Sequence, residues 1–183
     1  MITPADLMIN VYRYFMTAIS PQEQQAALAE NRTPQTVVEQ LHALNLLGSD
    51  STWDHFVFRG NEEDLPVIME ASGSACVLLS HGGYWTTQNR QNTMKFPQIW
   101  VSLFADTSRD DNAIPTNLTA QRGEDKVQRM YDVVSPIFHD PTNTIHRFGD
   151  IHVVNTFESQ VPVVEPVDDD GLFRLISTYE VTL

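Results

Sequence analysis

The spacing of apolar residues changes near residue 48, and this change constrains the fold more than any other feature of the sequence. Before it, apolar residues recur every three or four positions, as in helices; after it, they alternate or form short unbroken runs, as in strands. A helical stripe returns at about residues 123–139. We therefore predict a single α+β domain. Residues 1–48 form N-terminal helices, and residues 49–183 form a mainly antiparallel or mixed β-sheet with one crossing helix.

Three sites in the first 48 residues favour the start of a helix. Each places a hydroxyl residue directly before a proline, at Thr3, Ser20 and Thr33. The hydroxyl can cap the helix, and proline suits the first helical position. Gly48 is expected to end the third helix, because glycine readily adopts the backbone conformation found just after helix ends.

The strand predictions depend on residues 75–80 and 96–106. The first run, ACVLLS, is apolar throughout and indicates a strand buried on both faces. The second, FPQIWVSLFAD, alternates clearly. Between them, Gly82-Gly83 is expected to form a turn and residues 86–95 a polar loop. Further short strands are expected at residues 53–60, 65–72, 149–158, 161–166 and 172–183.

The stretch SHGGYW, which begins at Ser80, resembles the oxyanion-hole loop of α/β-hydrolase esterases. That fold also needs a serine within G-x-S-x-G, and no serine after His81 has this setting. Several βα units would have to follow, each of roughly 30 residues, whereas one helix is expected after Gly83. We therefore predict a non-enzymatic protein. A small hydrolase that uses the His81-Gly82-Gly83 turn is the alternative from another class.

No residue pattern predicts a metal or cofactor site. His139, His146 and His152 are six and seven positions apart, whereas helical metal ligands are three or four apart. The acidic segment 168–171 (DDDG) lacks the ligand spacing of a calcium loop and is expected to be a hairpin turn. Cys76 is the single cysteine, so no intrachain disulfide can form, and we expect a buried thiol.

The charge of the chain restricts its partners. With 24 acidic and 11 basic residues, the net charge is −13. A chain this acidic is not expected to hold nucleic acid through a broad basic surface, although DNA could pass along it. The apolar runs are too short to span a bilayer. The N-terminus has no basic segment or cleavage site typical of a signal peptide, so we expect synthesis and folding in a cytoplasm.

The order of the segments resembles the tail terminator proteins of long-tailed bacteriophages, especially phages of Gram-positive hosts. An N-terminal helix precedes a strand that begins Leu-Pro (residues 65–72), the Gly-Gly turn and the FPQIWVSLFAD strand. A helix that contains VQRMYDVVSPIFH (127–139) and a closing strand, FRLISTYEVTL (173–183), follow. The resemblance covers about residues 55–183 and the first helix. Residues 20–48 depart from it and are interpreted as an added helical segment.

The resemblance implies a hexameric ring that caps the tail tube, joins it to the head connector and lets DNA pass through its lumen. Its partners would be other copies of the chain, the tail tube protein and a head-completion or connector protein. It would be located at the tail–neck junction of the virion, with no membrane, cofactor or sequence-specific nucleic acid. A head–tail adaptor or neck protein is the alternative within this class. The candidate subunit or partner contacts are Tyr84, Trp85, Arg90, Lys95, Arg109, Asp168, Asp169 and Asp170.

Overall fold

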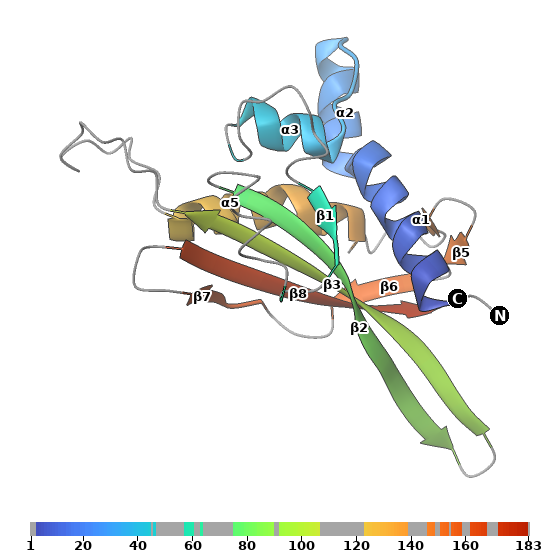
Figure 1. Cartoon of the computed structure of the whole chain (residues 1–183). Coiled ribbons are helices and arrows are strands. Elements are labelled where there is room, and N and C mark those ends of the chain that lie inside the picture. Colours follow the sequence, from blue (N-terminus) through green and yellow to red (C-terminus); the bar gives the residue numbers. More distant parts are fainter. Residues whose placement is uncertain are drawn as a thin grey trace.

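The computed structural model confirms the α+β class, with N-terminal helices, a mixed sheet and one further helix. It describes residues 3–44, 46, 57–60, 63, 75–89, 92–106, 123–138, 146–148, 151–153, 155–158, 162–167 and 172–182. The helices are α1 (Pro4–Thr17), α2 (Pro21–Glu30), α3 (Val37–Ala43) and α5 (Gly123–Phe138) (Figure 1). The strands are β1 (Val57–Arg59), β2 (Ala75–Asn89), β3 (Asn92–Asp106), β4 (His146–Phe148), β5 (Ile151–Val153), β6 (Asn155–Glu158), β7 (Val164–Pro166) and β8 (Leu172–Thr182).

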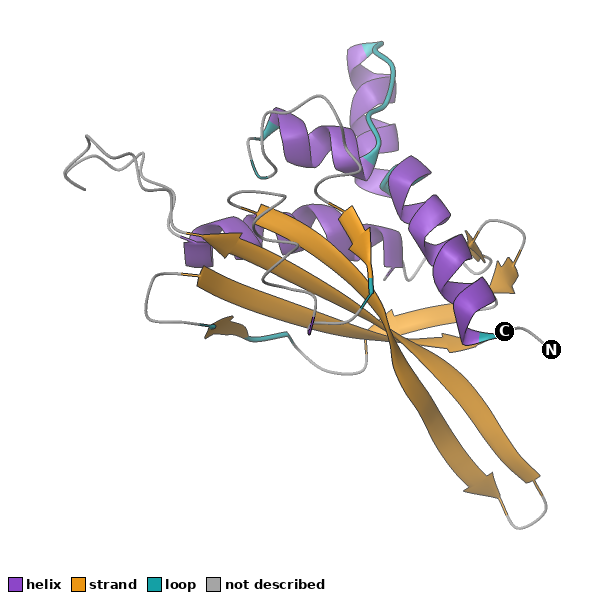
Figure 2. Cartoon of the chain, in the orientation of Figure 1, coloured by secondary structure: helices purple, strands orange, loops and turns teal. Residues whose placement is uncertain are grey.

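The main sheet has the strand order β1-β2-β3-β8-β6 (Figure 2). Strand β1 pairs with β2 in parallel, and the other pairs in this sheet are antiparallel. Strand β7 shares the outer edge of β8 with β6, because β6 pairs with residues 179–182 and β7 with residues 173–175. The strand predicted at 149–158 is therefore divided: β5 pairs with β4 in a separate small sheet, and β6 joins the main one.

Helices α1 and α5 pack their apolar stripes against one face of the sheet, and α5 crosses β3 and β8 (Figure 1). Helix α3 packs against α1 and α5. This face carries the main core, because alternate residues of β2, β3 and β8 point toward the helices. Its buried members include Leu7, Val11, Phe15, Val38, Leu41, Val77, Leu79, Val101, Leu103, Val127, Met130, Val134 and Tyr179.

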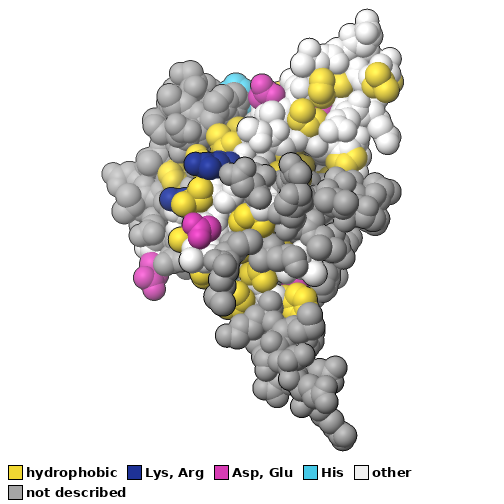
Figure 3. Space-filling model, turned by 90° about the vertical axis from the view of Figure 1, so that its right-hand side faces the viewer, with side chains coloured by type: hydrophobic (Ala, Val, Ile, Leu, Met, Phe, Trp, Pro, Cys, Tyr) yellow, Lys and Arg dark blue, Asp and Glu magenta, His cyan; other side chains and the backbone are white. Residues whose placement is uncertain are grey.

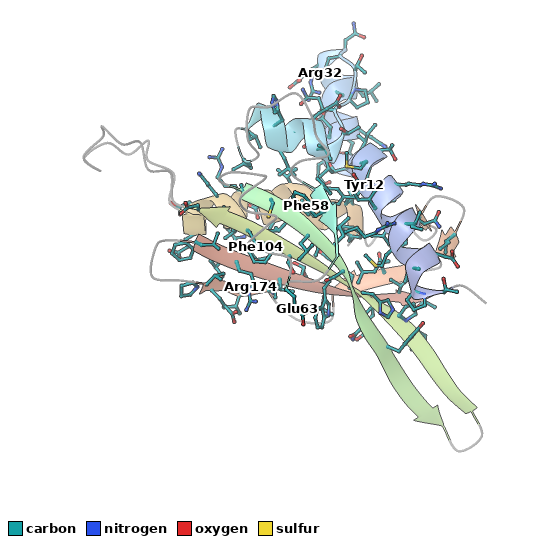
Figure 4. The ribbon with its side chains drawn as sticks, viewed as in Figure 1. Tyr12, Arg32, Phe58, Glu63, Phe104 and Arg174 are labelled. Carbon is teal, nitrogen blue, oxygen red and sulfur yellow. The ribbon has the colours of Figure 1, made fainter. Side chains whose placement is uncertain are left out.

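A smaller apolar cluster occupies the opposite face of the sheet. Cys76, Leu78 and Phe104 are all fully buried there, and Phe58 and Leu172 pack against them. Figure 4 labels two members of this cluster, Phe58 and Phe104. The prediction that residues 75–80 are buried on both faces is therefore confirmed, as is the buried thiol at Cys76.

Two of the three predicted caps are confirmed. The Thr3 hydroxyl accepts the Asp6 amide N–H, and the Ser20 hydroxyl accepts the Glu23 amide N–H. The prediction at Thr33 is wrong, because α3 begins three residues later and Thr36 is its N-cap. Residues 33–36 form neither helix nor strand where the chain crosses from α2 to α3.

Contacts on both sides of Thr36 fix the later start of α3. The Glu39 carboxylate accepts the Thr36 amide N–H, and the Thr36 hydroxyl accepts the Glu39 amide N–H, which completes a capping box. The Val37 amide N–H donates to the Ala18 carbonyl at 2.8 Å, so the first residue of α3 is bonded to the end of α1. Helix α3 also ends earlier than predicted, at Ala43, and Gly48 lies outside the described residues.

The added helical segment is held by one carboxylate. Glu23 is 9% exposed and accepts from the Arg32 guanidinium through both carboxylate oxygens and from the Gln35 amide N–H. These hydrogen bonds lower the pKa of Glu23, and the one from Arg32 has the largest effect. Helix α2 itself projects from the body, and its Leu28 is 84% exposed (Figures 1 and 3). The surface visible around it in Figure 3 shows separated hydrophobic side chains rather than a continuous apolar patch.

Two of the remaining predictions cannot be compared with the structure. The strand expected at residues 65–72 and the acidic turn at 168–171 lie outside the described residues. Among the helices that are described, none is both long and apolar enough to cross a membrane.

Candidate functional site: a projecting β-arm

Residues 86–89 and 92–95, which were predicted to lie in a polar loop, are instead strand residues of a long β-hairpin. Strands β2 and β3 are 15 residues each, and their pairing continues to Asn89 opposite Asn92. Figures 1 and 2 show this hairpin extending well beyond the helices and the other strands. The prediction failed because the segment has no apolar alternation: inter-strand pairing, not burial of one face, defines these strands.

We call residues 84–89 of β2 and 92–97 of β3 the β-arm. Each of its strands has six residues and spans about 20 Å at roughly 3.3 Å per residue. Strand β3 leaves β8 after Gln98, which is opposite Glu180. Strand β2 pairs with β1 only at residues 77–79. Among the described strands, β2 and β3 therefore pair with each other alone in this segment.

A β-bulge marks the base of the β-arm. His81 is opposite Ile99 and Gly83 is opposite Gln98, so Gly82 is the extra residue. The predicted Gly-Gly turn is wrong, because the strand continues through these two glycines. Gly83 has a φ of +95°, which glycine adopts easily. A Cβ at position 82 would lie 2.5 Å from Cδ1 and 2.7 Å from Cε2 of Trp100, so glycine is needed there for the indole to pack.

The bulge places His81 and Tyr84 on the same face of the hairpin. Their rings meet edge to face, with centroids 5.1 Å apart. The Gly83 amide N–H donates to His81 Nδ1 at 3.1 Å, and burial lowers the pKa of His81. In the hydrolase alternative, the backbone N–H groups of this segment would face an oxyanion. Here the Gly83 N–H is directed to the imidazole, so the local geometry does not favour that alternative.

The structure places some of the predicted contact residues on the β-arm. Tyr84 lies at its base and is 45% exposed. Trp85 and Lys95 are consecutive pairing positions within it, opposite Phe96 and Thr86. The others, Arg90, Arg109, Asp168, Asp169 and Asp170, lie outside the described residues.

Sequence reasoning missed Trp100. The alternation in FPQIWVSLFAD places Trp100 on the same face of the strand as Phe104. Phe104 is fully buried, whereas Trp100 is 38% exposed. The signal that could have identified it is Gly82, since a glycine inside a strand often marks a close approach by a neighbouring group. Trp100 and Tyr84 lie on opposite faces of the hairpin, so the base of the β-arm has an aromatic side chain on each side.

The charge of the hairpin end differs in sign from that of the rest of the chain. Residues 84–98 include Arg90 and Lys95 but no aspartate or glutamate. The other 168 residues have nine basic and 24 acidic side chains, a net charge of −15. Residues 84–98 are thus a basic segment within a strongly acidic sequence.

A second polar cluster joins α5 to the sheet. The Tyr131 hydroxyl donates to the Glu158 carboxylate at 2.7 Å, and burial together with this carboxylate raises the pKa of Tyr131 to about 12. Glu158 is opposite Tyr179 on β8, and burial near this carboxylate also raises the pKa of Tyr179. The cluster links α5 to β6 at the edge of the main sheet, which is a structural role.

No protein-family model matches this chain, and no curated protein matches it in sequence. Its function is therefore inferred from the order of its segments and from the β-arm.

Proposed function

We propose that this chain is a non-enzymatic virion protein, the tail terminator of a long-tailed bacteriophage. In this role, copies of the chain form a hexameric ring that caps the tail tube and joins it to the head connector. DNA passes through the lumen of the ring. The proposal combines the resemblance in segment order with the observation that carries it here, the β-arm.

The β-arm supports assembly for a physical reason. A two-stranded ribbon that projects from a domain is marginally stable alone in water. A projection of this kind is therefore expected to be stabilised by a partner. If each chain contributes one projection and one receiving surface, the contacts run head to tail and can close into a ring.

The acidic body supports the second part of the proposal. A net charge of −13 opposes tight binding to the phosphate backbone, because such binding depends on lysine and arginine. A ring lumen that repels DNA lets it slide. A head–tail adaptor would share this property, and the two roles differ in whether the ring binds the end of the tail tube.

The proposal is tested by the mass and shape of the purified chain in solution. Sedimentation across a range of concentrations, with negative-stain microscopy of the largest species, is expected to show a six-membered ring. Incubation with tail tubes is expected to place the ring at a tube end. A chain that stays monomeric in both experiments would overturn the proposal. If that monomer also hydrolysed an ester and lost this activity in His81→Ala, the hydrolase alternative would take its place.

An arm-shortened variant provides the matched control. Trp85 and Phe96 are opposite each other, so residues 86–95 can be replaced by Asn-Gly, which forms a two-residue hairpin turn. We expect the helical circular dichroism and the unfolding midpoint to be retained, because the core lies elsewhere. Ring formation should be lost. A variant that assembles as well as the parent would show that the β-arm is not the assembly element.

A further inference from the structure

We infer that His81 is a pH-sensitive switch at the base of the β-arm. Its neutral imidazole holds the bulge in the observed geometry through Gly83, and protonation of the ring breaks that contact. The contact lies within one chain, so the inference goes beyond the proposed ring and does not depend on it. If the β-arm mediates assembly, the switch makes assembly sensitive to acid.

The first step is the hydrogen bond that spans the bulge. The Gly83 amide N–H donates to His81 Nδ1 at 3.1 Å, and Gly82 between them is the extra residue of the bulge. The His81 ring also meets Tyr84 edge to face. One side chain therefore contacts the two residues that follow the bulge, and it helps to fix how β2 continues into the β-arm.

The second step is that this hydrogen bond requires a neutral imidazole. A ring nitrogen accepts a hydrogen bond only when it carries no proton, and both nitrogens of the imidazolium form are donors. With Nδ1 protonated, the ring and the Gly83 amide would present two N–H groups to each other. The bond is then lost, whether the ring stays in place or rotates away. Burial lowers the pKa of His81, so the ring is neutral at pH 7.

The third step is to identify the groups near His81 that change charge between pH 5 and 7. Strands β1 and β3 and helix α1 pack against β2. The described residues of these elements that can ionise are Asp6, Tyr12, Arg13, Tyr14, Arg59, Cys76, Tyr84, Lys95 and Asp106, and Tyr179 follows across β3 in the row of His81. Arginine, lysine, cysteine and tyrosine keep their charge state in this range. Hydrogen bonds with Thr3 lower the pKa of Asp6, so it stays ionised. Asp106 is opposite Ala75, about 20 Å along the strand from His81.

Acid is therefore expected to loosen the base of the β-arm while the core stays folded. Burial makes the pKa of His81 lower in the native state than in the unfolded chain. The contribution of the hydrogen bond is thus present above the ordinary value of 6.5 and is lost as the pH falls below it. Ile99, opposite His81, is fully buried, whereas Tyr84 on the arm side is 45% exposed. The change should be confined to the arm side of the bulge.

NMR spectroscopy of the full chain between pH 7.5 and pH 5 tests the switch. The shifts of the His81 ring and of the Gly83 amide proton should change together, with one midpoint below 6.5. At the acid end the Gly83 amide should exchange about tenfold faster relative to its intrinsic rate, the order expected for the loss of one hydrogen bond. Amides of β8, which β3 separates from β2, should keep their protection.

Two variants of similar size provide the controls. In His81→Asn, the side-chain oxygen can accept the backbone N–H two residues on, and it does not titrate. The Gly83 amide should therefore stay protected at both ends of the pH range. In His81→Leu the acceptor is absent, so the Gly83 amide should exchange rapidly at pH 7.5 as well. Circular dichroism at pH 7.5 establishes that each variant is folded.

Three results would overturn the inference. They are a His81 ring that stays neutral down to pH 5, a Gly83 amide that does not respond when the ring ionises, and an acid response that persists in His81→Asn. Sedimentation at pH 7.5 and pH 5 examines assembly separately. Assembly that weakens in acid in the parent but not in His81→Asn supports the inference. A chain that is monomeric at both pH values overturns the proposed ring but not the switch, which is measured at Gly83.

Discussion

Replacing Gly82 with alanine should destabilise the chain through a single neighbour, Trp100. The backbone at position 82 has no positive φ, so alanine is compatible with the main chain. The obstacle is steric, since the new Cβ would lie 2.5 Å from Cδ1 of the indole. The ring must therefore move outward and lose part of its packing on the sheet.

The size of the effect follows from the burial of Trp100. A tryptophan side chain presents roughly 250 Å², and 38% exposure leaves about 150 Å² of it covered. Losing half of that cover at about 25 cal/mol per Å² costs about 2 kcal/mol. Alanine in place of a glycine inside a strand stabilises the fold by about 0.5–1 kcal/mol, because it loses less backbone entropy on folding. The net cost is about 1–1.5 kcal/mol, which lowers Tm by about 2–6 °C in a domain of this size.

A double-mutant cycle measured by urea unfolding tests this reasoning. In a Trp100→Ala background the obstacle is absent, so Gly82→Ala should become neutral or stabilising by about 0.5–1 kcal/mol. The coupling energy between the two sites should then be about 2 kcal/mol. If the two substitutions are additive, the indole does not require glycine at position 82 and the explanation is wrong.

Three further predictions concern the caps and the two polar clusters. Thr36→Ala should cost about 1 kcal/mol in urea unfolding, whereas Thr33→Ala should change stability by less than about 0.5 kcal/mol. Glu23→Gln should destabilise most at neutral pH. The pKa of Glu23 is lowered by Arg32, so its contribution is present above the ordinary value of 4.5 and is lost as the pH falls below it. Tyr131→Phe should cost about 1–3 kcal/mol, because it removes the partner of a buried carboxylate oxygen. It should also reduce the loss of stability above pH 10, since the native pKa of about 12 keeps this hydroxyl neutral after the unfolded chain has begun to ionise.

Each of these predictions has a result that would contradict it. Equal costs at Thr33 and Thr36 would mean that α3 starts without a specific cap. If the difference in unfolding free energy between the parent and Glu23→Gln does not change with pH, the charge of Glu23 does not contribute to stability. If Tyr131→Phe loses as much stability above pH 10 as the parent does, the pKa of Tyr131 is not raised.

The parts of the fold that could be predicted are those encoded locally. Thr3 and Ser20 act as caps because the residues they bond are three positions away. The unbroken run at 75–80 indicated double-sided burial because it contains no polar residue until its last position. The cap predicted at Thr33 was wrong because the start of α3 depends on distant contacts, those of the Val37 amide N–H with Ala18 and of the Gln35 amide N–H with Glu23.

The candidate site was less predictable, because hydrogen bonding between strands leaves no apolar signature. The polar residues of the β-arm have the composition of a loop, and only their pairing with one another makes them strands. Tyr84 was predicted as a contact residue and is exposed at the base of the β-arm, and its role as a contact stays a prediction. Trp100 was not predicted, since its exposure depends on where the hairpin leaves the body.

The bulge at Gly82 has a consequence for local opening of the structure. On the body side of it, β2 has paired strands on both edges and a core on both faces. On the arm side, β3 is its one strand partner among the described residues. The arm hydrogen bonds can therefore open without disturbing the core, so β2 should belong to two cooperative units. Amide hydrogen exchange in the isolated chain should show a step in protection at the bulge. Assembly should remove that step by extending protection into residues 84–89.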